Sequence, residues 1–201
     1  MRAGRAYIIR RDRELAALTA AARQEVVDVL AEMGTVSAAE LAAALGRPAD
    51  ALYFHLRALI RAGLVKRAGY RSRPRGKEAL FRTIAPELRL RYDPANAANR
   101  AAVSAIVASM LRLGIRDFTR AFRHRQVVVS GPHRELWALR KTGRLSAAQL
   151  AHVNRCIEGL GRATSPPRAG GRLYAVTVVL TPLDHRTTDD RNAVTTERKR
   201  K

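Results

Sequence analysis

The sequence predicts a mainly helical α+β protein, in which small β elements accompany several helices. Apolar residues recur at intervals of three and four along several segments, the spacing that gives a helix one buried side. Two serine-led motifs have the form of a capping box, which marks a helix start. With 201 residues, 47% of them apolar, the chain can bury a core in one domain or two small ones.

A basic arm, residues 1–12, precedes the first predicted helix, residues 14–33. Gly34 follows this helix, and glycine commonly ends helices because it adopts a positive φ without strain. The apolar residues that fall at helical intervals are Leu15, Leu18, Val26, Val27, Leu30 and Met33. We therefore expect one continuous helix here.

The next two predicted helices are joined by a tight turn. In "VSAAEL" the Ser37 hydroxyl can accept from the Glu40 amide while the Glu40 side chain reaches back, which predicts a helix over residues 38–45. A glycine ends it, and Pro48 suits the first turn of the next helix because it lacks an N–H that would be unpaired there. That helix, residues 48–62, completes a predicted helix-turn-helix.

The segment after residue 63 is predicted to form a β-hairpin with a charged tip. Two apolar-containing runs flank a stretch rich in Gly, Pro and Arg. Its basic residues are Lys66, Arg67, Arg71, Arg73, Arg75 and Lys77, with no acidic residue among residues 66–77. We expect this wing to complete a winged helix-turn-helix domain over residues 13–92.

Residues 93–183 are predicted to hold the protomers of a homodimer together, and to bind an effector of unknown identity if there is one. A long helix, residues 99–125, carries an apolar stripe that we interpret as a dimer interface. The stripe consists of Val103, Ile106, Val107, Met110, Leu111, Phe118 and Phe122.

A small α/β extension is expected beyond this long dimerisation helix. A second capping box, Ser146 with Gln149, starts a helix that ends near Leu160. Apolar and β-branched residues predict short strands at residues 127–129, 136–139 and 172–180. The polar, basic tail, residues 184–201, is predicted to be disordered.

The charge balance indicates a polyanionic partner. The chain has 38 Lys and Arg against 17 Asp and Glu, a net charge of +21, which causes self-repulsion unless an anion is near. Nucleic acid fits best, because the most apolar later segment, residues 101–111, is too short to span a membrane. The single cysteine, Cys156, excludes an internal disulfide and favours a cytoplasmic, nucleoid-associated protein.

The polar side of helix 48–62 and the wing are the predicted contacts with double-stranded DNA. A helix fits the major groove, where Arg57 could bond guanine, Tyr53 a phosphate and Phe54 a thymine methyl group. Wing arginines suit a narrow minor groove. The predicted DNA-binding residues are Ser37, Arg47, Asp50, Tyr53, Phe54, His55, Arg57, Arg61, Lys66, Arg67, Arg71, Arg73, Arg75 and Lys77.

Residues 19–84, above all "SAAELAAALGRPADALYFHLRALIRAGLVKRAG", resemble the winged-helix domain of ArsR-type bacterial transcriptional regulators. The family pattern Ser-x-His-Leu-x-x-Leu-x-x-Ala-Gly-Leu-Val is matched by His55, Leu56, Leu59, Ala62, Gly63, Leu64 and Val65. Tyr53 stands where the family often has serine, so a phosphate contact there would use a phenol. The resemblance implies a homodimeric repressor or activator that reads a palindromic operator.

Metal sensing, which many relatives perform, is not expected. Residues 37–46 contain no cysteine, and Asp117 and His124 lie two helical turns apart, too far for one site. His152 and Cys156 lie one turn apart, but no third ligand is visible. No cofactor is predicted.

Two other classes of protein are alternatives to a DNA-binding regulator. A basic winged helix with an arginine-rich tail could instead serve an RNA-binding or ribosome-associated protein. An enzyme is not expected, because the sequence offers no nucleophile paired with a base, no phosphate-binding loop and no paired carboxylates.

Overall fold

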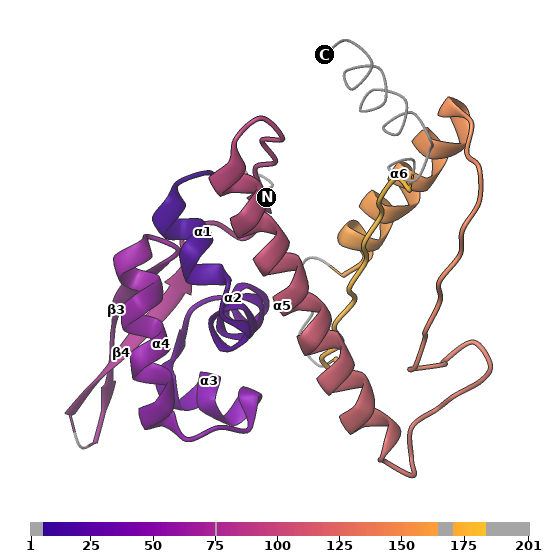
Figure 1. Ribbon diagram of the computed structural model, residues 1–201. Helices are drawn as coiled ribbons and strands as arrows, with labels where there is room; N and C mark the ends of the chain where they lie inside the picture. The colour runs from indigo at the N-terminus through magenta and orange to yellow at the C-terminus, as the bar shows by residue number, and fades with distance from the viewer. Residues whose placement is uncertain (1–5, 75, 165–170, 184–201) are drawn as a thin grey trace, which may run out of the picture.

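The computed structural model describes residues 6–74, 76–164 and 171–183, and it confirms a mainly helical α+β fold with a small sheet. The helices are α1 (Asp12–Leu18), α2 (Ala21–Met33), α3 (Ala38–Leu45), α4 (Ala49–Ala62), α5 (Ala97–Phe122) and α6 (Ala147–Ala163) (Figure 1). The strands are β1 (Tyr7–Ile9), β2 (Val36–Ser37), β3 (Val65–Arg73), β4 (Gly76–Thr83) and β5 (Leu88–Leu90). Residues 1–5 of the predicted arm, Arg75, residues 165–170 and the predicted tail, residues 184–201, lie outside the described residues.

A single hydrophobic core joins α1 to α4, the sheet and the first half of α5. Leu52, Leu56 and Leu59 of α4 are completely buried in it, as their spacing predicts. The three-stranded antiparallel sheet has the order β2-β4-β3 and closes one side of the core. The leucines therefore fix α4 by one side and leave its opposite side at the surface.

The predicted helix at residues 14–33 is wrong as one element, because the chain breaks between α1 and α2. The Thr19 hydroxyl donates to the Ala16 carbonyl at 2.9 Å, and the Arg23 guanidinium donates to the carbonyls of Ala16 and Ala17. These bonds satisfy carbonyl groups that have no partner once α1 ends. No glycine or proline marks the break, so the sequence pattern did not reveal it.

The predicted arm of residues 1–12 is also corrected, because residues 7–9 form β1, which pairs in parallel with β5. The Tyr7 hydroxyl donates to the buried Glu14 carboxylate at 2.6 Å, and the amides of Arg10 and Arg11 donate to it as well. Burial raises the pKa of Glu14, but these hydrogen bonds outweigh it, so the net shift is downward. A buried, ionised carboxylate thus anchors the start of the chain.

The turn between α3 and α4 follows the prediction closely. The Ser37 amide donates to Glu40 at 2.8 Å, and the Glu40 amide donates to the Ser37 hydroxyl at 3.2 Å, which completes the capping box. Gly46 has a φ of 61°, a left-handed conformation that favours glycine. Pro48 occupies the N-cap position of α4, one residue before the predicted place.

The predicted hairpin is confirmed as β3 and β4. Val65 pairs with Thr83 and Arg73 pairs with Gly76, with an irregularity between Arg67 and Tyr70. The hairpin extends beyond the helices, at the lower left of Figure 1. We call residues 65–83 the wing.

The long helix α5 is confirmed, but its predicted apolar stripe divides between two faces. Val103 and Ile106 are buried in the core of their own chain, and Val107 and Met110 pack against that core. These four residues are therefore not free for a partner. Leu111, Phe118 and Phe122 are exposed, and so is Ile115, which the prediction omitted. Sequence spacing placed both sets on one helix without showing which face the core would cover.

The chain after α5 lies on the far side of that helix from the wing (Figure 1). The second capping box is confirmed, since the Ser146 amide donates to Gln149 and the Gln149 amide donates to Ser146. Residues 127–129, 136–139 and 172–180 do not form the predicted strands in the part of the chain that is described. A strand needs a neighbouring strand for its backbone groups, and β-propensity alone does not supply one.

Candidate nucleic-acid interface

The surface side of α4 displays the aromatic and charged residues that the sequence predicts. Asp50, Tyr53, Phe54, Arg57 and Arg61 are all exposed, and Phe54 retains 64% of its accessible surface. They lie opposite the buried leucines because successive residues of a helix are rotated by about 100°. A rigid core therefore presents one polar and aromatic row to the outside.

Arg57 and Arg61 have no salt bridge and no side-chain hydrogen bond to any residue that the structure describes. Arginine cannot lose its proton in a protein, so both side chains carry an uncompensated positive charge at the surface. Each of the two side chains has five N–H donors that remain available to a ligand. A guanine edge or a phosphate matches that donor pattern.

His55 lies at the flank of this row and is partly buried. Its Nδ1 atom is buried and has no hydrogen-bond partner among the described residues. Its ring meets Phe54 edge-on with centroids 5.6 Å apart. Burial lowers the pKa of His55, and the positive charges of Arg47 and Arg23 lower it further, so the imidazole is neutral near pH 7. In this conformation the buried Nδ1 atom cannot reach a base.

Ser37 was predicted to contact DNA, and this prediction is corrected. Its side chain is 1% exposed, and its hydroxyl accepts from the Glu40 amide as the cap of α3. A capping hydroxyl in the core has no route to a ligand. The role of Ser37 is to start α3.

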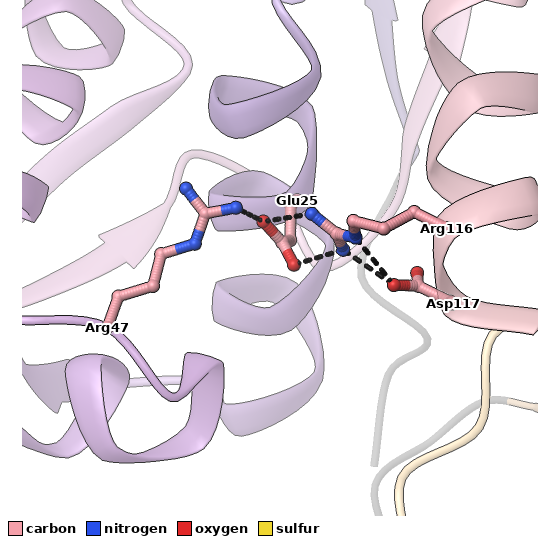
Figure 2. Close-up of polar contacts among 4 residues, drawn as sticks. All are labelled: Glu25, Arg47, Arg116 and Asp117. Carbon is pink, nitrogen blue, oxygen red and sulfur yellow. Dashed lines mark hydrogen bonds and ion pairs between the residues drawn. The ribbon is translucent and has the colours of Figure 1, made fainter. Parts of the chain in front are cut away.

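Arg47, in the turn before α4, is held by a carboxylate rather than left free (Figure 2). Glu25 of α2 accepts from Arg47 at 2.5 Å and from Arg116 of α5 at 2.5 Å. Arg116 also bonds Asp117 at 2.6 Å. The bond to Glu25 is the main cause that raises the pKa of Arg116. Glu25, which the sequence analysis did not single out, thus links the helix-turn-helix to α5.

Two of the wing arginines, Arg71 and Arg73, are paired as well. Arg71 donates to Glu40 at 2.6 Å, and Arg73 bonds Glu78 at 3.0 Å. The hydrogen bond from Arg71, followed by that from the Ser37 amide, lowers the pKa of Glu40 to about 2. One carboxylate therefore caps α3 and ties the wing to it.

The other wing residues are more accessible. Arg67 donates to the Tyr70 hydroxyl at 3.1 Å and lies over its ring at 5.7 Å. Lys66 and Lys77 are exposed, and Arg75 lies outside the described residues. The wing thus offers two lysines and two arginines, Arg67 and Arg82, with no carboxylate partner among the described residues.

Comparison with known proteins agrees with this geometry. Residues 18–68 match the model of a family described as a helix-turn-helix domain, a stretch that runs through α2, α3 and α4 and into β3. No curated protein matches the chain. The match and the exposed basic row of α4 together support a DNA-binding regulator of the helix-turn-helix class. Domains of this class are typically not enzymes.

The described residues offer little basis for a metal site or a membrane span. No group of three or more His, Cys, Asp or Glu that could hold a metal ion occurs among the described residues. The Cys156 sulfur lies 3.6 Å from His152 Nε2 on the exposed surface of α6, without a third ligand in the described chain. Within the same described ranges, no helix is both long and apolar enough to cross a membrane.

Proposed function

We propose that this protein is a sequence-specific transcriptional regulator that binds DNA as a homodimer, with α4 in the major groove and the wing on the adjoining backbone. The observation that carries the proposal is the row of exposed residues on α4, in which Arg57 and Arg61 have no carboxylate partner among the described residues. We propose that the regulator acts without a metal-sensing site.

The side chains of this row have complementary partners on a DNA duplex. Arg57 bonds guanine O6 and N7 with two parallel N–H donors, and Phe54 contacts a thymine methyl group. Asp50, in the first turn of α4, accepts from a cytosine amino group. Tyr53 donates to a phosphate and fixes the helix along the groove.

The wing supports binding through the DNA backbone rather than through bases. Lys66, Lys77 and Arg67 supply positive charge without an acidic partner in the described chain, whereas Arg71 and Arg73 must first leave Glu40 and Glu78. Backbone contacts of this kind add affinity that is independent of sequence. Specificity therefore comes mainly from α4.

The dimer contact that we propose is the exposed apolar face of the second half of α5. Leu111, Ile115, Phe118 and Phe122 recur at intervals of four, three and four, the spacing of a helix that packs against another helix. The Phe118 and Phe122 rings stack with centroids 6.0 Å apart. For a dimer formed through this face to read two successive half-sites, its two α4 helices must lie about 34 Å apart.

The experiment is selection of genomic fragments by the purified protein at moderate salt, followed by footprinting. We expect protection of a two-fold symmetric duplex site. Equal binding to structured RNA and random duplex DNA would instead support an RNA-binding protein. Analytical ultracentrifugation of the wild type and of Ile115→Glu tests the dimer, because a charge on the apolar face should give a monomer. A wild type that sediments as a monomer at every concentration would end the dimer proposal.

A further inference from the structure

A shallow depression of about 330 Å³ lies beside the exposed row of α4, between α1, α2 and the second half of α4. Its charged residues are Arg13, Arg23 and Arg61, one from each helix. The rest of its lining is alanine: Ala16, Ala17, Ala58 and Ala62. We call these seven residues the arginine cradle.

The three arginines are not used to balance acids in the fold. None of them forms a salt bridge with a described residue, unlike Arg47, Arg71 and Arg73. Arg23 is nonetheless held in place, because it donates to the carbonyls of Ala16 and Ala17. Its field reaches His55, whose pKa it lowers together with burial and Arg47. Three positive charges thus line this depression without an acidic partner among the described residues, and Arg23 is the one held by hydrogen bonds.

The alanine residues that line the depression determine which groups can enter it. Small alanine side chains leave open space beside the three arginines that line the depression. A tetrahedral phosphate accepts from several guanidinium groups, since its oxygens face in different directions and arginine donors match them. Because the depression is open to the surface, a phosphate that belongs to a longer chain can enter it.

We propose that the arginine cradle binds one phosphate of the DNA backbone, at the edge of the groove that α4 reads. Arg61 belongs both to the exposed row and to the cradle, so the two surfaces are continuous. This inference rests on the proposed function, and it adds a contact that neither the exposed row of α4 nor the wing provides. The break between α1 and α2 acquires a role, because it brings Arg13 and Arg23 to the same depression.

The test compares the salt dependence of DNA binding by the wild type and by Arg13→Ala/Arg23→Ala, which leaves the exposed row of α4 intact. Loss of one phosphate contact should lower the slope of log affinity against log salt by about 0.9. Binding at fixed salt should weaken roughly tenfold, and by the same factor for the selected site and for random duplex, because a phosphate carries no sequence information. The single variant Arg13→Ala should shift both quantities in the same direction by less.

The matched control is Arg155→Ala/Arg162→Ala, which removes two positive charges from the exposed surface of α6, on the far side of α5 from the wing. A slope for Arg13→Ala/Arg23→Ala equal to that of the control would overturn the cradle, while wild-type binding to its operator would leave the proposed function standing. No duplex binding by the wild type would overturn both. Thermal melting of each variant separates lost contacts from lost folding, and Arg13, which has no bond to a described residue, should not affect melting.

Discussion

The arginines of α4 and those of the wing carry the same guanidinium group in different surroundings. Arg57 and Arg61 meet no carboxylate among the described residues, whereas Arg71 and Arg73 are each bound to one. An arginine bound to an acid contributes to the shape of the protein and must give up that bond before it can hold DNA. The number of basic residues in a segment therefore overstates what it can offer to a nucleic acid.

The largest expected effect is on stability, because the leucines of α4 hold this helix against the core and so keep its arginines at the surface. Leu56→Ala should lower the free energy of unfolding by about 2–5 kcal/mol, because the leucine is completely buried and its loss leaves a cavity. Urea unfolding measures this. The control is Leu150→Ala on α6, whose side chain is 42% exposed and should cost far less. Equal costs would mean that α4 is not fixed by its leucines.

Arg57→Ala should show the next largest effect, now on binding. We expect operator affinity to fall by about 1–3 kcal/mol and discrimination to relax at one base pair, because the bonds to guanine are lost. Lys66→Ala is the comparison, since this wing lysine has no carboxylate partner among the described residues and its loss should weaken all sequences alike and lower the salt slope. Binding measured to a set of single-base operator variants distinguishes the two. Unchanged discrimination by Arg57→Ala would show that α4 lies differently in the groove.

Glu40→Gln should have a smaller effect, in the opposite direction. Glutamine keeps the capping box but breaks the ion pair, so Arg71 becomes free to contact phosphate. We expect duplex affinity to rise by a factor of roughly two to five, the scale of an exposed ion pair. Glu158→Gln on α6 removes the same charge away from the wing and should leave affinity nearly constant. A fall in affinity for Glu40→Gln would show that the tethered wing is the binding form.

The smallest effect concerns acid stability. The pKa of Glu40 is lowered from 4.5 to about 2 in the folded protein, so its ion pair stabilises the fold fully above about pH 4.5. That contribution should disappear as the pH falls from 4.5 towards 2. The difference in melting temperature between the wild type and Glu40→Gln should therefore shrink over this range. A constant difference would show that Arg71 does not act through the carboxylate.

The sequence allowed prediction of features that depend on neighbours along the chain. The capping boxes at Ser37 and Ser146, the hairpin and the exposed row of α4 all follow from local spacing and composition. The wing was predicted as a charged hairpin, but the pairing of Arg71 with Glu40 joins residues 31 positions apart. No local pattern indicates such a contact, so the sequence could not show which arginines were already occupied.

Helix α5 shows the same limit for apolar residues. Its pattern correctly predicted a long helix, but it could not show that the core of the same chain would cover Val103 and Ile106 and leave Phe118 and Phe122 exposed. The three-residue strands β1 and β5 are too short for alternation to stand out, and each exists only because the other lies beside it. The arginine cradle was missed because it requires the break after α1.

The burial of Val103 and Ile106 bears on where this protein can be cut. A truncated polypeptide that stops at residue 92 would retain the exposed row of α4 and the wing. It would lose the side chains of α5 that complete its hydrophobic core. A polypeptide that extends through Met110 keeps these core side chains and leaves out the exposed apolar face from Leu111 to Phe122. The longer piece is therefore the natural choice for studying a single reading unit by itself.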